Sequence, residues 1–243
     1  MFLYKTMCGR YNIISSAQGL YDAFSIISAD LDFGFVEPSY NIHPTPAGIA
    51  KDQWVTAPII RICSGKVEAL PAVWPFIPKW AKGQVPKYST ANAKAETVAT
   101  TKSYQHAWKR SQRCLIPATG FYEWQVIQNA NHKQPYNIKV SDQPVFAMAG
   151  IWEQSSDVET KDSVISFSIL TTQANQLMAE IHNTRQRMPV IISPDSYKDW
   201  LEVAADEAQH YCHPYAADKM TAYKISTYVN NPNNNDAKCI EKL

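Results

Sequence analysis

The sequence has no apolar run that approaches the roughly 18 residues that a membrane-spanning helix requires, so we expect no membrane association. The residues before Met7 contain no hydrophobic segment of the secretory kind, which argues against a signal peptide there. The cysteines are few and odd in number, and no Cys-x-x-Cys pair occurs. Such scattered cysteines argue against a disulfide framework and favour reduced thiols in a cytoplasmic protein. They are Cys8, Cys63, Cys114, Cys212 and Cys239.

Metal ligands, internal repeats and low-complexity tracts are also sparse or absent. His210, Cys212 and His213 lie close together, but three potential ligands in one short stretch more often coincide by chance. We therefore predict neither a metal site nor a cofactor. A chain of 243 residues can form one large domain or two small ones, and the lack of a clear linker favours one domain over residues 8–243.

The formal net charge of +1 does not by itself indicate a nucleic-acid partner, but its distribution is uneven. The segment from Lys79 to Arg113 holds eight basic residues against the single acid Glu96, a balance of +7. A positive surface of this kind attracts phosphates, although a solvated lysine-rich surface has the same composition. Aromatic residues beside such charges suit single-stranded nucleic acid, yet at least two of the four present are expected in an ordinary core. These four are Trp74, Phe76, Trp80 and Trp108.

The secondary structure that the patterns predict is rich in strands. Two strand pairs are expected, at 55–62 with 67–73 and at 134–140 with 143–152, followed by a half-buried strand at 163–171. Helices are expected at 16–24, at 103–110 with Ser103 as its cap, at 174–181, and at 193–201 with Ser193 and Pro194 at its start. The Asn-rich C-terminal segment is expected to form a loop and a short last strand. Together these elements predict one α+β domain with a mostly antiparallel sheet and peripheral helices.

Four short stretches carry residues that are able to perform chemistry. Cys8 precedes Gly9-Arg10, and Asn92 lies in Thr-Ala-Asn-Ala-Lys-Ala-Glu-Thr. Glu123 stands between two aromatic residues, where loss of hydration raises a carboxyl pKa and suits the group for proton transfer. His182 follows a predicted helix and titrates near neutral pH. Each also has an ordinary structural role: a buried cysteine, an ion-paired glutamate, a helix-capping histidine and a turn-closing asparagine.

The order of these stretches resembles the SOS response-associated peptidase (SRAP) family. The family begins Met-Cys-Gly-Arg, here Met7–Arg10, and carries an Asn-Ala-Arg-x-Glu-Thr stretch, here 92–97. A Cys-x-x-Pro-x-x-Gly-aromatic-aromatic-Glu-Trp stretch corresponds to 114–124, and Ile-His followed by Arg-Met-Pro-Val corresponds to 181–190. The resemblance extends over nearly the whole chain. It implies a barrel-like α+β core and an activity on abasic sites in single-stranded DNA.

The resemblance also implies the roles of particular residues. Cys8, as the first residue of the mature chain, would cross-link to the sugar aldehyde of an abasic site. Glu123 would serve as acid and base, His182 would move protons and help to reverse the adduct, and Asn92 would hold the reacting end. The implied DNA contacts are Arg10, Lys94 and Thr171 at phosphates, Trp80 as a wedge beside the lesion, and Trp124 near the backbone. A monomer that binds abasic single-stranded DNA, with lyase-type and autopeptidase activity, is the expectation.

The functional groups of Cys8 explain why its position matters. An α-amine has a pKa of about 7.7–8.0, so a useful fraction is neutral in cells and can condense with an aldehyde. The neighbouring thiol can then close onto the imine carbon to form a five-membered thiazolidine. A cysteine inside the chain cannot do this, because its nitrogen is an amide.

Two departures from the family pattern affect this expectation. Lys94 stands where the family has arginine, which keeps the charge but loses the bidentate grip on phosphate. Residues 1–7 are expected to be a leader or part of a mis-assigned start. Cys8 gains a free amine only if translation starts at Met7, which we favour, or if a leader is removed. Two other function classes stay open: a cysteine peptidase that uses Cys8, His182 and Asn92, and a non-catalytic single-strand binder.

Overall fold

The computed structural model describes residues 8–157 and 161–243, so the predicted leader lies outside the described residues. The strands are β1 (Tyr11–Ile13), β2 (Ser39–Ile42), β3 (Thr56–Cys63), β4 (Lys66–Val73), β5 (Asn92–Lys94), β6 (Arg113–Ala118), β7 (Gly120–Gln125), β8 (Gln134–Val140), β9 (Phe146–Ser156), β10 (Ser163–Gln173), β11 (Arg187–Pro189), β12 (Ile191–Ile192) and β13 (Met220–Lys224). The α-helices are α1 (Ala17–Phe24), α2 (Gln105–Lys109), α3 (Gln176–Ile181) and α4 (Tyr197–Glu202).

Five strands of the larger sheet close into a barrel. β10 pairs with β4, β4 with β3, β3 with β6, β6 with β9, and β9 returns to β10. Closure crowds the strands where they meet. A side chain at Gly150 would place its Cβ 2.6 Å from Ile116 Cδ1 and 2.8 Å from Cys114 Sγ, so glycine is required there. The predicted α+β class with a mostly antiparallel, barrel-like core is confirmed.

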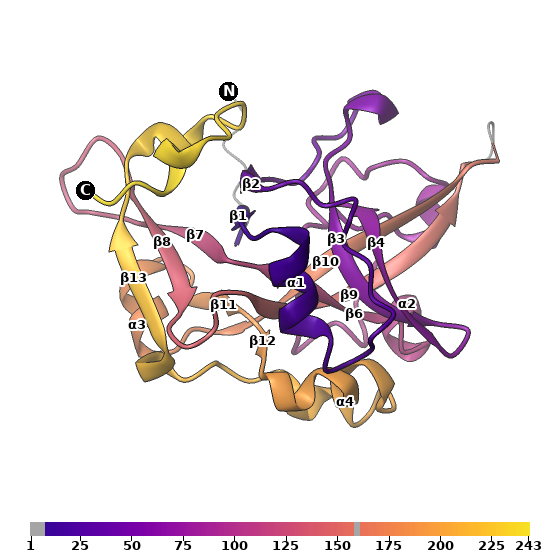
Figure 1. The fold of residues 1–243 in the computed structure, drawn as a ribbon. Helices are drawn as coiled ribbons and strands as arrows, with labels where there is room; N and C mark the ends of the chain where they lie inside the picture. The colour runs from indigo at the N-terminus through magenta and orange to yellow at the C-terminus, as the bar shows by residue number, and fades with distance from the viewer. Residues whose placement is uncertain (1–7, 158–160) are drawn as a thin grey trace.

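The second sheet has the order β13-β8-β7-β1-β2. Figure 1 shows β1 and β7 between the barrel and the outer strands β8 and β13. One predicted pairing is wrong, because β8 pairs with β7 and β13 and meets the approach to β9 only through the bridge Val140–Gln143. At Ser141-Asp142 the chain passes from one sheet to the other instead of closing a hairpin between the two strands.

The strand predicted at 163–171 is not half-buried as its alternation suggested. β10 is buried along most of its length, because it has sheet partners on both edges and the barrel interior on one face. The polar residues of the pattern, Ser166 and Ser168, are therefore fully buried. Ser166 Oγ accepts a hydrogen bond from Ile77 N at 2.8 Å, which satisfies part of its polar capacity.

The predicted helices exist, although two begin differently. α1 is capped as its sequence suggests, since Ser16 Oγ accepts from Gly19 N at 3.2 Å. Ser103 does not cap α2, which begins after Tyr104; its hydroxyl lies 2.9 Å from the Tyr88 hydroxyl instead. Ser193 and Pro194 start a 3-10 turn, Pro194–Ser196, that precedes α4. Within the described ranges, no helix has the length and apolar character needed to cross a membrane.

The Asn-rich C-terminal segment folds back onto the start of the chain. It forms the 3-10 helices Thr227–Asn230 and Ala237–Ile240, and only a single bridge, Ile225–Lys242, stands where a last strand was predicted. Asn41 Nδ2 donates to the carbonyl oxygens of Val229, Asn231 and Asn234. These bonds hold the segment beside β1 and β2, as Figure 1 shows.

Candidate active site

Pairing of β1 with β7 brings Cys8 to Glu123 across 115 residues of sequence. Tyr11 pairs with Phe121, and Tyr122 N donates to Arg10 O at 3.0 Å, which fixes the register. Cys8 N consequently donates to Glu123 Oε1 at 2.6 Å. In this chain that nitrogen is the amide of the Met7–Cys8 bond, and it marks where the α-amine lies when Cys8 is the first residue. The Cys8 backbone has φ of 40°, a left-handed conformation that non-glycine residues rarely adopt.

The carboxyl group of Glu123 is buried, with only 2% of the residue exposed. Burial raises its pKa to about 8, against the opposing effect of hydrogen bonds from the backbone N–H groups of Cys8 and Trp124. At neutral pH the group therefore holds a proton for most of the time. A carboxylic acid that lies against the nitrogen of Cys8 is positioned to donate and accept protons there.

His182 faces the other oxygen of the same carboxyl group. Its Nε2 lies 3.8 Å from Glu123 Oε2, and its Nδ1 lies 3.0 Å from Arg187 O. Because a carbonyl oxygen only accepts, Nδ1 carries the hydrogen and Nε2 of the neutral ring presents its lone pair toward Glu123. Burial lowers the pKa of His182, which favours this neutral form. A protonated carboxyl beside a neutral imidazole is a pair through which one proton can move.

Asn92 completes the cluster at the start of β5. Its Nδ2 lies 3.5 Å from Cys8 O, at the limit of a hydrogen bond. The backbone carbonyl oxygen of Asn92 accepts a hydrogen bond from Tyr104 Oη at 3.0 Å. β5 is itself held in register by β10, where Ile169 pairs with Asn92. The structure therefore brings Cys8, Glu123, His182 and Asn92 together, although these residues come from separate parts of the sequence.

The thiol of Cys8 is not activated as a thiolate. Only 1% of Cys8 is exposed, and burial, followed by the negative charge of Glu123, raises the pKa of the thiol well above its usual range. Catalytic cysteines of peptidases have a lowered pKa instead. In the described contacts, Asn92 approaches the Cys8 backbone, and His182 Nδ1 is bonded to a carbonyl rather than to an asparagine.

The Asn-rich C-terminal segment hydrogen-bonds to two residues that were predicted to contact DNA. Arg10 donates to Val229 O, to Asn230 O at 2.8 Å and to Asn41 Oδ1 at 3.1 Å. Trp124 Nε1 donates to Asn230 Oδ1 at 2.7 Å. Both side chains remain partly exposed, so they are fixed in place without being removed from the surface. Their contacts with DNA stay a prediction.

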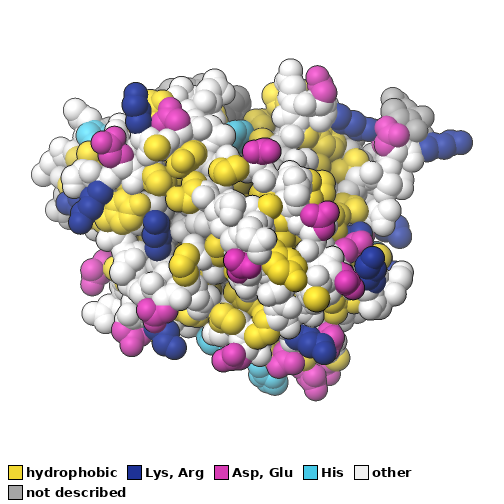
Figure 2. All heavy atoms as spheres, in the orientation of Figure 1, with side chains coloured by type: hydrophobic (Ala, Val, Ile, Leu, Met, Phe, Trp, Pro, Cys, Tyr) yellow, Lys and Arg dark blue, Asp and Glu magenta, His cyan; other side chains and the backbone are white. Residues whose placement is uncertain are grey.

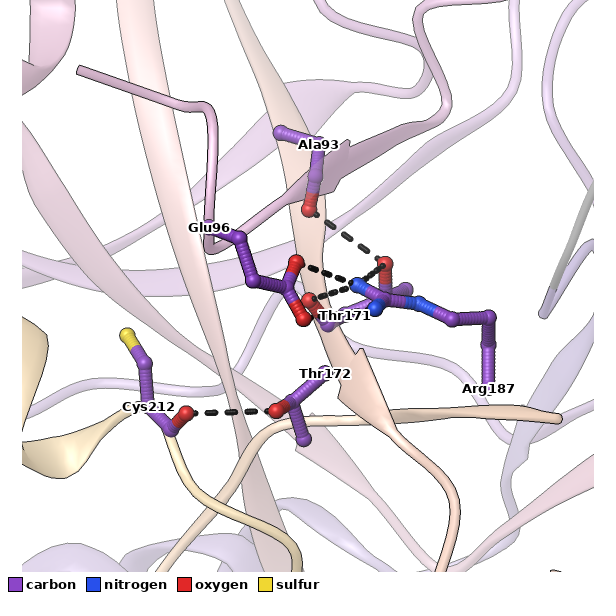
Figure 3. Close-up of polar contacts among 6 residues, drawn as sticks. All are labelled: Ala93, Glu96, Thr171, Thr172, Arg187 and Cys212. Atoms are coloured by element: carbon purple, nitrogen blue, oxygen red, sulfur yellow. Dashed lines mark hydrogen bonds and ion pairs between the residues drawn. The ribbon is translucent and has the colours of Figure 1, made fainter. Parts of the chain in front are cut away.

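Thr171 and Lys94 lie on neighbouring strands but differ in accessibility. Lys94 is exposed, whereas Thr171 is fully buried, which weighs against the direct phosphate contact predicted for it. Thr171 instead accepts hydrogen bonds from Arg187 Nη2 through its carbonyl oxygen at 2.7 Å and its hydroxyl at 3.3 Å. Figure 3 shows the Arg187 guanidinium between Thr171 and Glu96. The carboxylate oxygens of Glu96 accept hydrogen bonds from Arg187 Nη1 and Nη2 at 2.6 and 2.8 Å.

Arg187 is not among the site residues predicted from the sequence. The signal was present, because Arg187 begins the Arg-Met-Pro-Val stretch that follows His182. Its backbone oxygen sets the orientation of the His182 ring, and its side chain joins β10 to the segment after β5. Arg187 therefore links the walls of the site.

The basic segment from Lys79 to Arg113 is only partly a surface feature. Arg113 is buried, with 1% exposed, and donates to Trp200 O at 2.7 Å and to Val203 O, so counting it toward a positive surface was wrong. Three of the four aromatic residues in and beside the segment are core residues, and only Trp80 is exposed. On the face drawn in Figure 2, basic and acidic side chains interleave.

No group of three or more potential metal ligands occurs among the described residues. His210 and His213 are exposed, and Cys212 is buried, where its thiol lies 3.6 Å from Ala208 O. All five cysteines, each of which is within the described ranges, carry free thiols.

Replacement of Glu123 by glutamine is expected to stabilise the 1–243 chain at alkaline pH. The folded pKa of about 8 lies above the ordinary value of 4.5, so the contribution of Glu123 to stability is complete below about pH 4.5 and is lost as pH rises through 8. The full shift corresponds to a penalty on the order of 5 kcal/mol, which the neutral amide does not carry. Thermal unfolding should show a Tm about 10–20 °C higher for Glu123→Gln at pH 9, and nearly equal values at pH 5.

Glu96 provides a control of opposite sign. The hydrogen bonds from Arg187 lower the pKa of Glu96, so its contribution is present at neutral pH and lost on acidification. Glu96→Gln should therefore lower Tm at pH 7 and approach the wild-type Tm in acid. Equal Tm differences for Glu123→Gln at pH 5 and pH 9 would contradict the raised pKa.

Comparison with known proteins identifies relatives along most of the chain. A family model described as "SOS response associated peptidase (SRAP)" matches residues 7–232. The abasic site processing protein YoaM of Bacillus subtilis is 35% identical over 240 residues, covering 97% of this chain and 98% of that protein. The abasic site processing protein HMCES of Mus musculus is 30% identical, covering 70% of this chain and 56% of its own length.

Solved structures share the fold. A Bacteroides thetaiotaomicron protein superposes with a TM-score of 0.77 at 26% identity, covering 97% of this chain and 100% of its own. A Bordetella bronchiseptica protein superposes with a TM-score of 0.73 at 24% identity, covering 90% of this chain and all of its own. The second likeness, at lower identity, shows the fold alone.

Proposed function

This chain belongs to the SOS response associated peptidase family, and from that premise we propose that it processes abasic sites in single-stranded DNA by covalent capture through Cys8. The relatives named abasic site processing proteins support the substrate class. The observation that carries the covalent step is the 2.6 Å contact between Cys8 N and Glu123 Oε1. A group able to donate and accept a proton at that nitrogen supports the covalent step, because this nitrogen becomes an amine when Cys8 is the first residue.

The proposed reaction has three steps: addition of the amine to the aldehyde, loss of water, and closure of the ring by the thiol. The neutral amine of Cys8 adds to the sugar aldehyde carbon, and a proton moves from nitrogen to oxygen to give the carbinolamine. The carbinolamine hydroxyl takes a proton from Glu123 and leaves as water, and the iminium that results returns its N–H proton to the Glu123 carboxylate to give the imine. The thiol then adds to the imine carbon, and its proton passes to the nitrogen, which closes the thiazolidine. Aldehyde and aminothiol become thiazolidine and one water, with no oxidant or metal required.

The positions of Glu123 and His182 suit these proton transfers. Glu123 is largely protonated at neutral pH, so it can supply the proton that turns the carbinolamine hydroxyl into water. His182 Nε2 lies next to the same carboxyl and can remove or restore its proton. Asn92 Nδ2, 3.5 Å from Cys8 O, helps to hold the Cys8 backbone during all three steps.

A thiolate-dependent peptidase fits the geometry less well. Burial raises the pKa of the Cys8 thiol, and the Asn92 and His182 contacts do not form the ordered cysteine–histidine–asparagine set that such an enzyme uses. The cross-linking reaction requires no thiolate in its first step, since the amine attacks first. We therefore retain the cross-linking proposal alone.

The proposal is tested with the Cys8-first protein and an oligonucleotide that carries one abasic site. After denaturation, a shifted band on a gel and an intact mass equal to protein plus DNA less one water are expected. The same oligonucleotide with a tetrahydrofuran analogue, which has no aldehyde, should give no adduct. Absence of a denaturation-resistant adduct with the true abasic site would refute the proposal and favour a non-catalytic binder.

Replacement of His182 by alanine is expected to slow release of the adduct by roughly 100-fold, in the range of a lost general acid–base catalyst. Reversal requires protons to move between the thiazolidine nitrogen and sulfur. In the proposed mechanism, His182 returns the proton that Glu123 gives up. Preformed adduct is diluted into excess unlabelled abasic DNA, and the surviving labelled band is followed on a denaturing gel. His210→Ala changes an exposed histidine outside the site and should release at the wild-type rate.

A further inference from the structure

One side chain joins the two segments that carry Glu123 and His182. Asn183 directly follows His182, and Val126 directly follows the last residue of β7, the strand that carries Glu123. Asn183 Oδ1 accepts a hydrogen bond from Val126 N at 3.1 Å, and Asn183 Nδ2 donates to Val126 O at 2.9 Å. The amide thus satisfies both backbone groups of Val126, as a neighbouring strand would. These two hydrogen bonds form the Asn183–Val126 junction.

A second amide reinforces this junction. Gln125 Nε2 donates to Glu180 O in α3 at 3.0 Å, and Gln125 Oε1 accepts from Tyr136 Oη in β8 at 3.1 Å. Tyr136 lies opposite Glu123 in the register of β7 and β8. The end of β7 is therefore fixed to the C-terminal end of α3 by contacts that lie both before and after His182 in the sequence.

The separation between Glu123 and His182 makes this arrangement relevant to the reaction. Glu123 Oε2 and His182 Nε2 lie 3.8 Å apart, which exceeds the roughly 2.6–3.2 Å over which a proton passes directly. A swing of the His182 ring toward Glu123 would disturb the 3.0 Å contact between its Nδ1 and Arg187 O. A proton therefore passes after an approach of about 1 Å or through one bridging water. Both routes depend on how the end of β7 is placed relative to α3.

The same junction lies between two loops that carry positive charges. Lys133 is on the loop that joins β7 to β8, and Arg185 is on the loop that joins α3 to β11. Burial is the largest influence on the pKa of Glu123, which it raises, and on that of His182, which it lowers. Lys133 and Arg185 lower the pKa of both groups. A shift of the junction would therefore move these cations as well as the pair.

We propose that Asn183 is a positioning residue that holds Glu123 and His182 at the separation through which they exchange a proton. The inference rests on the proposed function, because that exchange serves release of the adduct. Asn183 acts through the other two residues and not on the sugar itself. Asn183 and Val126 are both exposed, so water can replace their hydrogen bonds, and loss of the amide loosens the junction without leaving a buried polar group unpaired.

The test measures release of preformed adduct from the Cys8-first protein after dilution into excess unlabelled abasic DNA. Asn183→Ala should release roughly 10- to 100-fold more slowly, the effect of about 1 Å of misplacement. Gln125→Ala keeps the junction but removes the neighbouring bond to α3, so a smaller loss is expected, and it tests the inference even where Asn183→Ala does not fold. Thr184→Ala is the matched control, because it changes the exposed neighbour of Asn183, and it should release at the wild-type rate.

Two further measurements separate positioning from a general structural effect. In a protein that already carries His182→Ala, Asn183→Ala should cause no further slowing, because no imidazole remains to be positioned. The affinity of Asn183→Ala for an oligonucleotide with the tetrahydrofuran analogue, measured by fluorescence anisotropy, should equal that of the wild type. A merely structural change would slow release in both backgrounds and would weaken binding.

Release by Asn183→Ala and Gln125→Ala at the wild-type rate would overturn the inference, as would equal slowing with and without His182 or a matching loss of DNA affinity. Each of these results leaves the proposed function intact, because the adduct has formed. A Cys8-first wild type that forms no adduct would instead refute the proposed function and, with it, the role of Asn183.

Discussion

The Cys8-first protein is expected to form a denaturation-resistant adduct with abasic single-stranded DNA at least 100-fold faster than the 1–243 chain does. In the longer chain the nitrogen of Cys8 is an amide, whose lone pair is delocalised and does not attack an aldehyde. The thiol alone yields a thiohemiacetal, which reverts on denaturation. With both groups free, ring closure is intramolecular and gains the large effective concentration of a neighbouring nucleophile.

The comparison is made by gel shift and intact mass on both proteins under identical conditions. Cys8→Ser in the Cys8-first protein keeps the amine but removes the sulfur and should give no adduct that survives denaturation. Cys63→Ser, at the partly exposed end of β3, is the matched control and should react normally.

Equal adduct yields from the two chains would show that the amine is irrelevant and would end the thiazolidine mechanism. That outcome would also require a different explanation for the contact between Cys8 N and Glu123 Oε1. A purely structural hydrogen bond would then be the simplest account.

The second large effect is expected for Glu123→Gln, which should slow adduct formation by about 100- to 1,000-fold in the Cys8-first protein. Glutamine keeps the size and the acceptor oxygen that faces Cys8 N, but it cannot donate and retake a proton. Single-turnover adduct formation on quenched gels gives the rate. Glu202→Gln, an exposed position on α4, should leave that rate unchanged.

The pH dependence of the rate of adduct formation shows whether Glu123→Gln has removed the acid that the reaction uses. The wild-type rate should rise with pH as the α-amine, with a reference pKa of about 7.7–8.0, becomes neutral. It should fall again at higher pH as Glu123, whose pKa is raised by burial, loses its proton. Glu123→Gln should retain the rising limb and lose the falling one. A variant that is slow but keeps the full bell-shaped profile would assign the acid to another residue.

Local signals in the sequence predicted several elements correctly. The predicted strand pair forms as β3 and β4, joined by a turn at Ser64-Gly65, and Ser16 caps α1. These features depend on residues a few positions apart, so short windows suffice to predict them. The exposed Trp80 and the core positions of Trp74 and Phe76 were not distinguishable from such windows, because both environments accept an aromatic residue.

Errors arose where a distant partner decided the outcome. Arg113 looked like a surface cation, but the carbonyl oxygens of Trp200 and Val203 bind its guanidinium in the interior. β8 looked like the partner of β9, but closure of the barrel assigns β9 to β6 and β10 and leaves β8 to the second sheet. Ser103 looked like a cap for α2, but its hydroxyl contacts Tyr88.

The sequence by itself determined the chemical inventory: a cysteine that can become N-terminal, an aromatic-flanked glutamate, a histidine after a helix and an asparagine in a short polar stretch. Only the tertiary structure decided that these four converge, that Glu123 holds its proton near neutral pH, and that Thr171 is buried behind Arg187. The physical reason is that pKa and accessibility depend on what surrounds a group in space, and that environment exists only once β1 pairs with β7 and the barrel has closed.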